Sequence, residues 1–237
     1  MSAGAPVPTG ADALAEPGIL VLDVGGNAVK FKLSSGEERR KFPSGPGLTP
    51  ERMVEKVLEE SGDWRFDRVS IGCPGPISGD RIALEPVNLG PGWCAFDFAA
   101  AFGRPVRLVN DAAMQALGSY EGGKMLFLGL GTGLGAALVI EGAVLSLEVA
   151  HLPYKAGRTF EDYAGRRGLE RMGKRRWRKA VRDIVERLRA ALVADHVVLG
   201  GGNAGLLEEM PEGCRRGHNR NAFLGGVRLW EGGVRVL

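Results

Sequence analysis

The chain has 237 residues, 44% of them hydrophobic and 25% charged, which is ordinary for a globular protein of one large domain or two lobes. Its formal net charge of +3 is too small to indicate nucleic-acid binding. The uncharged run from Met125 to Ile140 is too short and too rich in glycine for a membrane span. Cys73, Cys94 and Cys214 form no C-x-x-C pair, which argues against a disulfide framework and predicts a reducing, cytoplasmic setting.

The first predicted elements are a tail and a hairpin that contains an unexpected acid. Residues 1–17 are rich in alanine, proline and glycine and lack the features of a signal peptide, so they predict a disordered tail. Apolar residues at 19–23 and 28–33 predict two strands joined by a Gly-Gly-Asn turn at 25–27. A hairpin explains the glycines but not Asp23, because a buried unpaired carboxylate is costly. Such an acid is usually kept for a metal or a reacting group.

A helix and a strand are predicted next. Residues 49–61 predict a helix, since Thr49 suits the N-cap and Pro50 suits the first helical position. Residues 68–77 predict a strand that runs into a Pro-Gly loop.

An asparagine and an acid then separate a strand at 105–109 from a helix that is expected to close at Gly122. Asn and Asp are favoured N-caps, so Asn110 and Asp111 are explained by capping alone. Asp111 also suits a general base, which would take the proton from an attacking hydroxyl. The two interpretations are compatible.

The second half of the chain repeats the pattern of the first. Residues 124–140 predict another strand, glycine turn and strand, in which Gly131 lies 106 residues after Gly25. Residues 168–194 predict one long helix, and residues 196–210 predict a strand, a triple-glycine turn and the start of a helix. The repeat predicts two α/β lobes, each of which opens with a glycine-turned hairpin. The apolar positions of the long helix are Trp177, Val181, Ile184, Val185, Leu188 and Leu192.

Five segments carry a family resemblance through their order along the chain: DVGGNAVKF, GCPGPI, VNDAAMQALG, LGLGTGLGAAL and VVLGGGNA. From residue 18 to about 226 the chain resembles the bacterial ROK glucokinases, including the polyphosphate/ATP glucokinase branch of the actin-like ATPase superfamily. The resemblance implies an α/β, two-lobed actin-like ATPase (ribonuclease H-like) fold with a cleft between lobes 18–110 and 111–237, the last helix packing on the first lobe. It also implies transfer of the terminal phosphoryl group of ATP to a hexose, glucose above all, giving glucose 6-phosphate.

The resemblance assigns roles to particular residues, and each role has a physical reason. Glycine turns leave backbone N–H groups free to bind phosphate, and a carboxylate can hold Mg²⁺ through water. A hexose has several hydroxyl groups, so it is bound well by a dense set of polar partners. Asp23 would hold Mg²⁺ and Asp111 would be the general base. The sugar would contact Asn88, Asn110, Asp111, Glu148, His151 and Glu161. The nucleotide would contact Gly25, Gly26, Asn27, Lys30, Gly131, Thr132, Gly133, Gly200, Gly201, Gly202 and Asn203.

Departures from the family pattern leave alternatives open. Many ROK proteins bind a structural zinc after the histidine motif, but residues 151–165 contain no cysteine, so we expect no zinc. A DNA-binding repressor is not expected, because about 18 residues precede the first strand.

An inactive sugar-binding protein and a polyphosphate-dependent kinase remain as alternatives. Residues 166–189 favour polyphosphate, with eleven Lys or Arg against three acids. A homodimer without nucleic-acid or membrane partners is expected.

Overall fold

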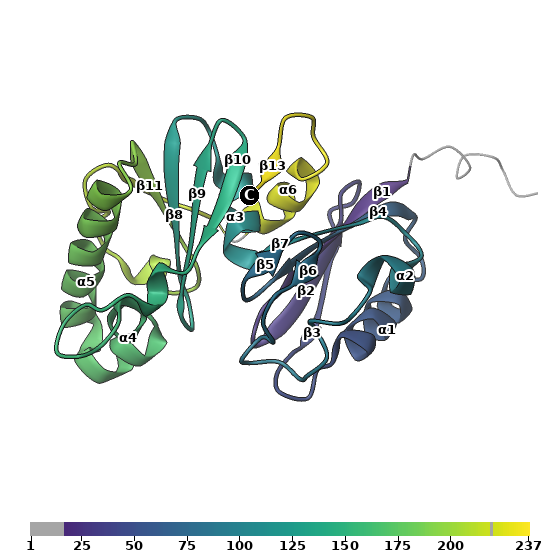
Figure 1. Cartoon of the computed structure of the whole chain (residues 1–237), viewed down its shortest axis with the longest axis horizontal. Helices are drawn as coiled ribbons and strands as arrows, with labels where there is room; N and C mark the ends of the chain where they lie inside the picture. The colour runs from purple at the N-terminus through teal and green to yellow at the C-terminus, as the bar shows by residue number, and fades with distance from the viewer. Residues whose placement is uncertain (1–16, 219) are drawn as a thin grey trace, which may run out of the picture.

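The computed structural model describes residues 17–218 and 220–237, which form two β-sheets with two helices between them (Figure 1). Almost all of the tail predicted at 1–17 lies outside the described residues. Within the part of the chain that the structure describes, no helix is long and apolar enough to cross a membrane.

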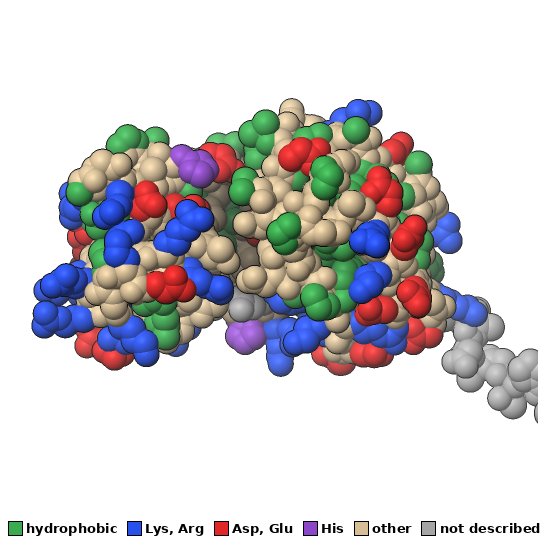
Figure 2. Space-filling model, turned by 90° about the horizontal axis from the view of Figure 1, so that it is seen from below, with side chains coloured by type: hydrophobic (Ala, Val, Ile, Leu, Met, Phe, Trp, Pro, Cys, Tyr) green, Lys and Arg blue, Asp and Glu red, His purple; other side chains and the backbone are tan. Residues whose placement is uncertain are grey.

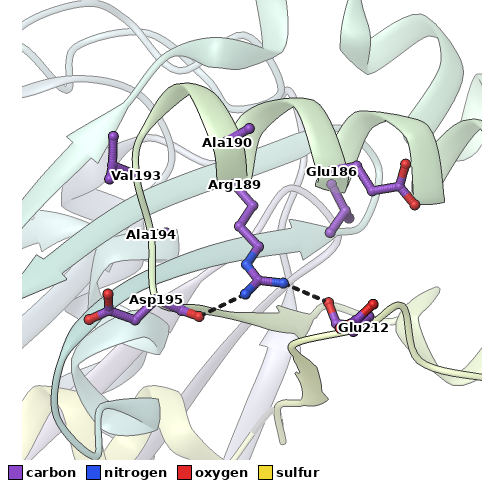
Figure 3. A pocket seen from close by; sticks show the side chains of 8 residues that line it. Glu186, Arg189, Ala190, Val193, Ala194, Asp195 and Glu212 are labelled. Carbon is purple, nitrogen blue, oxygen red and sulfur yellow. Dashed lines mark hydrogen bonds between the residues drawn. The ribbon is translucent and has the colours of Figure 1, made fainter.

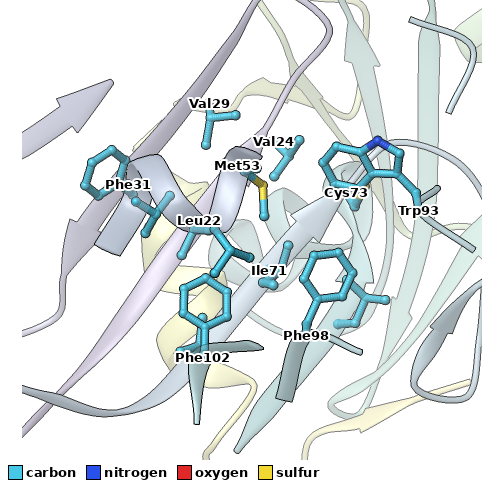
Figure 4. Packing of buried hydrophobic residues seen from close by; sticks show 14 of the residues in the cluster. Leu22, Val24, Val29, Phe31, Met53, Ile71, Cys73, Trp93, Phe98 and Phe102 are labelled. Carbon is cyan, nitrogen blue, oxygen red and sulfur yellow. The ribbon is translucent and has the colours of Figure 1, made fainter. Parts of the chain in front are cut away.

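The first sheet has five strands in the order β3-β2-β1-β4-β7. Its first three strands form an antiparallel meander, and β4 and β7 continue from β1 in parallel. Helices α1 (Pro50–Glu60) and α2 (Phe98–Phe102) cover one face over a core of aliphatic and aromatic side chains (Figure 4). The strands are β1 Gly18–Val24, β2 Ala28–Leu33, β3 Arg39–Pro43, β4 Phe66–Cys73 and β7 Val106–Asn110, and the small separate hairpin is β5 Ile77–Ser78 and β6 Arg81–Ile82.

The second sheet repeats the order and directions of the first. Strands β12-β11-β8-β9-β10 match β7-β4-β1-β2-β3 one for one, and β13 adds to the outer edge of β10. The internal repeat predicted from the glycine turns is therefore present in the strand topology. The elements are β8 Lys124–Leu130, β9 Leu134–Ile140, β10 Ala143–Leu147, η1 Val149–His151, α4 Phe160–Ala164, α5 Arg166–Ala191, β11 His196–Gly200, η2 Ala204–Leu206, β12 Cys214–Arg216 and β13 Arg235–Val236.

Helices α3 (Asp111–Ser119) and α6 (Asn221–Arg228) fill the space between the sheets (Figure 1). Alternation along β1 shows the arrangement, because Leu20 and Leu22 belong to the core under α1, whereas Val21 belongs to the core of α3 and α6. In the second sheet, Leu126 and Leu128 likewise join the core under α5, and Phe127 joins the shared core. Each sheet is thus covered on one face by its own helices and on the other by α3 and α6.

The two central helices cross so closely that glycine is required at the contact. A Cβ atom added to Gly118 would lie 1.8 Å from the carbonyl oxygen of Asn221, and one added to Gly225 would lie 1.8 Å from that of Met114. Helix α6 also approaches the first sheet closely, because a Cβ at Gly226 would lie 2.2 Å from Val21. A hydrogen bond adds to this contact, because the Ser70 hydroxyl donates to the Gly226 carbonyl at 2.7 Å.

Most predicted elements are confirmed, and three helix predictions need correction. Helix α1 begins at Pro50 after an N-cap at Thr49, as predicted. The long helix, predicted at 168–194, spans 166–191 and is broken at Gly173, whose φ of 73° and ψ of 161° are not helical. The helix expected to close at Gly122 ends at Ser119, and the helix expected after the triple glycine is a single 3₁₀ turn.

The glycine crossing predicts a specific loss of stability. We expect Gly225→Ala to lower the free energy of unfolding by about 3 kcal/mol, the upper end of typical overpacking costs, because the new methyl group can be accommodated only by separating α6 from α3. Gly232→Ala is the matched control, since a Cβ there meets no atom within 4 Å. Urea unfolding followed by circular dichroism measures both, and equal midpoints for the two variants would contradict the crossing.

Candidate functional site

The acid at the end of β1 is buried and carries an ion pair. Asp23 is 7% exposed, and the Lys30 ammonium lies 3.1 Å from its Oδ2 atom. The pairing follows from the hairpin, because Asp23 and Lys30 are direct cross-strand partners on one face of β1 and β2. The ion pair offsets part of the cost of burying this carboxylate.

The strand register brings Asp111 close to Asp23. Asp23 on β1 pairs with Gly72 on β4, which pairs with Val109 on β7, two residues before Asp111. Gly72 has no side chain to separate the two acids, and a Cβ there would lie 3.4 Å from the Asp111 Cα atom. Burial, and then the neighbouring Asp23 carboxylate, raise the pKa of Asp111 from 3.8 to about 6. The charge of Glu148, in the second half of the chain, adds a smaller contribution in the same direction.

Asn110, rather than Asp111, caps helix α3. Its Oδ1 atom accepts from the N–H groups of Ala112 at 2.9 Å and Ala113 at 3.2 Å, and its Nδ2 atom donates to the Gly75 carbonyl at 3.0 Å. The predicted capping at this pair of residues is thus confirmed, and Asn110 is the N-cap residue. Asp111 is the first helical residue, and its Oδ1 atom also accepts from the Ala112 N–H at 2.8 Å. One amide hydrogen of Asn110 is left for any further partner.

The second glycine turn, residues 131–133, is hydrogen-bonded to the residue that follows the triple-glycine turn at 200–202. Asn203 donates from its backbone N–H to the Leu130 carbonyl at 2.9 Å and from its side chain to the Gly131 carbonyl at 3.0 Å. Gly201 makes this approach possible, since it has a φ of +82° and a Cβ there would lie 2.4 Å from the Leu130 carbonyl oxygen. The Arg166 N–H donates to the Thr132 carbonyl at 3.1 Å. Two of the turns predicted to contact the nucleotide therefore lie side by side.

Glu161 lies on the second glycine turn. Its Oε2 atom accepts from the Leu134 N–H at 3.2 Å, and a Cβ at Gly133 would lie 2.2 Å from the same oxygen. Sequence resemblance assigns this carboxylate to the sugar, and the structure places it in contact with the turn assigned to phosphate. In this position it occupies one of the backbone donors that an anion would use.

Glu148 and His151 form an exposed pair on the second half of the chain. The His151 Nε2 atom lies 3.9 Å from the Glu148 Oε2 atom, and their side chains are 73% and 53% exposed. Glu148 immediately precedes the 3₁₀ turn η1 and His151 is its last residue, and Ala150 between them is buried. The two side chains are free to contact a ligand.

The loop at 85–93 lies against the first glycine turn. A Cβ added to Gly26 would be 3.2 Å from the Cβ of Asn88, so the predicted sugar residue and the predicted phosphate turn are adjacent. Glu85 closes this loop by accepting from the N–H groups of Trp93 at 3.1 Å and Cys94 at 3.2 Å, which lowers the pKa of its carboxyl group. The sequence analysis missed Glu85, although an acid at the start of a short loop that ends in Gly-Trp is the available signal.

Other parts of the structure bear on where a ligand could bind. A cavity of about 740 Å³ at the end of α5 is lined by Arg189, Asp195 and Glu212, among others (Figure 3). It lies at the start of β11, opposite the end that carries Gly200 to Asn203, and contains no predicted site residue. A separate hollow between the two halves is visible in Figure 2. Among the described residues no three His, Cys, Asp or Glu side chains gather as a metal site.

Comparison with known proteins establishes the family. The ROK family model matches residues 20–147, which is more than half of the chain. The chain belongs to the ROK family. Among curated relatives, it is 28% identical over 141 residues to the bifunctional enzyme NanE/NanK of Brucella melitensis, covering 54% of this chain and 27% of that protein. It is 27% identical over 173 residues to the kanosamine kinase of Amycolatopsis mediterranei, covering 63% and 56%. The chain thus spans about a quarter to just over half of these relatives.

The fold is shared with a solved structure of a sugar kinase. The inorganic polyphosphate/ATP-glucomannokinase of Arthrobacter sp. strain KM matches with a TM-score of 0.77 and 21% identity, covering 90% of this chain and 97% of that one. At this identity the likeness bears on the fold alone, and it confirms the predicted fold class.

The raised pKa of Asp111 predicts a pH-dependent stability. Because the folded chain binds this proton more tightly than the unfolded chain, the carboxylate destabilises the fold progressively as the pH rises from 3.8 to about 6. We expect Asp111→Asn to be more stable than the parent by up to about 3 kcal/mol at neutral pH, with the difference vanishing near pH 4. Urea unfolding across this range measures it, with Asp80→Asn at an exposed acid as control. A pH-independent difference would contradict the prediction.

Proposed function

We propose that this ROK protein is a sugar kinase, which transfers the terminal phosphoryl group of ATP to a hexose hydroxyl, with glucose as the leading substrate and glucose 6-phosphate as the product. The observation that carries the proposal is the position of Asp111. Asp111 is the first residue of α3, and its carboxylate lies beside that of Asp23. The glycine turns that follow β1 and β8 have a backbone able to bind anions.

Asp111 acts as the general base. A pKa of about 6 leaves the carboxylate ionised at neutral pH and basic enough to accept a proton from the sugar hydroxyl as it attacks phosphorus. Asn110 supports this role, because the cap that it supplies fixes the start of α3. The Asp111 Oδ1 atom accepts from the Ala112 N–H at 2.8 Å, and its Oδ2 atom has no hydrogen-bond partner among the described residues. The rate depends on the position of Asp111 as much as on its basicity.

The residues around Asp23 fit Mg²⁺. This ion commonly binds through one or two carboxylates, several waters and the substrate phosphates, so no three-residue cluster is needed. Lys30 occupies the Oδ2 atom of Asp23, and the Oδ1 atom has no hydrogen-bond partner among the described residues. When bound, Mg²⁺ would neutralise charge on the donor phosphates. Asp23 would hold it through water, and Lys30 would contact the phosphates that approach Gly25, Gly26 and Asn27.

The sugar would lie between the Asn88 loop and the Glu148–His151 pair, with Asn110 and Glu161 as further contacts. Kanosamine kinase and the glucomannokinase are named for hexose-type sugars, which supports a hexose substrate. Glu161 would have to leave the Leu134 N–H in order to reach the sugar, which would release that donor for phosphate.

The function is tested with the purified chain. Glucose, mannose, fructose, N-acetylmannosamine and kanosamine are each incubated with Mg²⁺ and ATP or polyphosphate, and sugar phosphate is measured by mass spectrometry. We expect phosphorylation of at least one hexose, glucose first among them. If no sugar is phosphorylated with either donor, the kinase proposal is wrong.

Removal of the proposed base gives a sharper prediction. We expect Asp111→Asn to lower kcat by roughly 10²–10⁴-fold with little change in sugar binding, because the amide can still hydrogen-bond the sugar hydroxyl but cannot take its proton. Sugar affinity is measured by calorimetry in the same samples. Turnover near that of the parent would exclude Asp111 from the mechanism.

Polyphosphate is the alternative donor, and the basic segment 166–189 supports it. Six of its cations are exposed and form no ion pair or side-chain hydrogen bond with any described residue. Figure 2 shows basic side chains gathered on the half of the molecule that carries α5. The segment begins at the second glycine turn, where the Arg166 N–H meets Thr132. The six are Arg166, Arg167, Lys174, Arg175, Arg176 and Lys179.

A triple charge reversal separates the two donors. We expect Arg175→Glu, Arg176→Glu and Lys179→Glu together to reduce polyphosphate-dependent activity by roughly tenfold or more, with little effect on ATP, because a phosphate chain contacts a row of cations. The control reverses Arg52, Arg65 and Arg81, which are exposed on the first half. Equal losses with both donors, or no polyphosphate activity in the parent, would make the segment an ordinary solvated helix face.

A further inference from the structure

A second cavity lies behind the candidate site, between the first sheet and α6. Its volume is about 360 Å³, and it is lined by residues of β1, β2 and β3 on one side and by α6 on the other. The apolar part is formed by Val21, Leu33, Phe223 and Leu224. Leu224 is 44% exposed although it faces this cavity, so part of the apolar surface is open to solvent.

The strand register places two cations beside this apolar surface. Val21 pairs with Lys32, and Lys32 pairs with Arg39, so the three side chains form a row across β1, β2 and β3 on one face. Val21 packs against α6 through Gly226, which shows that this is the face turned toward the helix. Arg220, at the start of α6, adds a third cation from the opposite wall.

These cations are poorly neutralised within the described chain. Among the described residues that line the cavity, Glu37 is the only acid. It lies 3.4 Å from the Lys32 ammonium and its side chain is fully exposed, so this ion pair is weak. The side chains of Arg39 and Arg220 make no ion pair or hydrogen bond with any residue that the structure describes. The cavity therefore combines an apolar floor with an excess of two positive charges.

We propose that this cavity binds a small molecule that carries an anionic group on an apolar body. Its volume lies within the range of small-molecule sites, and its lining offers an apolar contact and convergent charge in one place. A guanidinium is well suited to a carboxylate, phosphate or sulfonate, because it forms paired charge-assisted hydrogen bonds.

The position of the cavity gives the ligand a regulatory effect. Val21 and Lys32 lie two residues from Asp23 and Lys30 on the same strand faces, a separation of roughly 7 Å. The other wall is α6, which meets α3 through Gly225 and Met114. A ligand that contacts both walls favours one arrangement of the first sheet against α3 and its Asp111. This regulatory part rests on the proposed kinase function, whereas the binding does not.

The binding is tested on the full chain with two fluorescent probes that share an apolar body. Anilinonaphthalenesulfonate carries an anionic group, and phenylnaphthylamine is its uncharged counterpart. We expect the sulfonate to bind at one site with a Kd at least roughly tenfold below that of the neutral probe, because charged hydrogen bonds add to the apolar contact. Equal affinity for the two probes, or no saturable binding of the sulfonate, would overturn the proposal.

Variants locate the bound probe. Arg39→Glu with Arg220→Glu should weaken the sulfonate by roughly tenfold or more and leave the neutral probe little changed. The matched control is Arg81→Glu with Arg235→Glu, which reverses two exposed cations away from the cavity. Hydrogen exchange should show slower exchange in α6 when the sulfonate is bound to the parent. Unchanged sulfonate affinity in the first variant, or an equal loss in the control, would overturn the proposal.

The regulatory part is tested by assaying sugar phosphorylation while the sulfonate is titrated. The rate of the parent should change with the same half-saturating concentration as the fluorescence, and the Arg39→Glu, Arg220→Glu variant should keep its basal rate without that response. Binding without any change in rate would overturn the regulatory part. An absence of phosphorylation in every sample would count against the kinase function and leave the binding result intact.

Discussion

The close crossing of α3 and α6 is the contact on which the arrangement of the molecule depends. Gly118 and Gly225 allow the two helices to touch backbone to backbone, at a distance that a single methyl group would prevent. Gly226 continues the contact onto Val21 of the first sheet. Because α3 begins at Asp111, this crossing also sets where the candidate base lies relative to both sheets. Packing and chemistry are thus connected through three glycines.

The electrostatics of the candidate site follow from strand pairing. Asp23, Gly72 and Val109 form one row across β1, β4 and β7, which places two carboxylates at the same edge of the sheet. Lys30 offsets the charge of Asp23, whereas burial, and then the neighbouring Asp23 carboxylate, raise the pKa of Asp111 to about 6. Of the two acids, Asp23 is ion-paired and Asp111 has a raised pKa.

Both glycine turns already have part of their backbone engaged. In the first turn the Gly25 N–H donates to the Ala28 carbonyl, and Ser44 donates to the carbonyls of Gly25 and Asn27. The second turn is contacted by Asn203, Arg166 and Glu161, which together use its carbonyls and one of its N–H groups. The first turn meets the Asn88 loop, which Glu85 holds closed. In the proposed kinase function, a donor phosphate would compete with Glu161 for the Leu134 N–H at the second turn.

The sequence by itself determined the elements and their repetition. Hydrophobic alternation and glycine turns located both hairpins, the Thr49 cap located α1, and the apolar stripe through Trp177 and Val181 located the buried face of α5, because these signals are local. The order of five motifs was sufficient to indicate the family. The break at Gly173 and the short turn after Asn203 could not be predicted, since a helix pattern does not show where tertiary contacts end it.

The tertiary structure alone decided how the candidate residues meet. Capping chemistry allowed either Asn110 or Asp111 to start α3, and the contact of Asn110 with the Gly75 carbonyl, 35 positions away, belongs to the folded chain. The ion pair of Asp23 with Lys30 depends on register, and the position of Glu161 on the second turn depends on where α4 packs. Such contacts join residues distant in sequence, and their geometry is fixed by packing and strand register. A local pattern of residues contains no information about either.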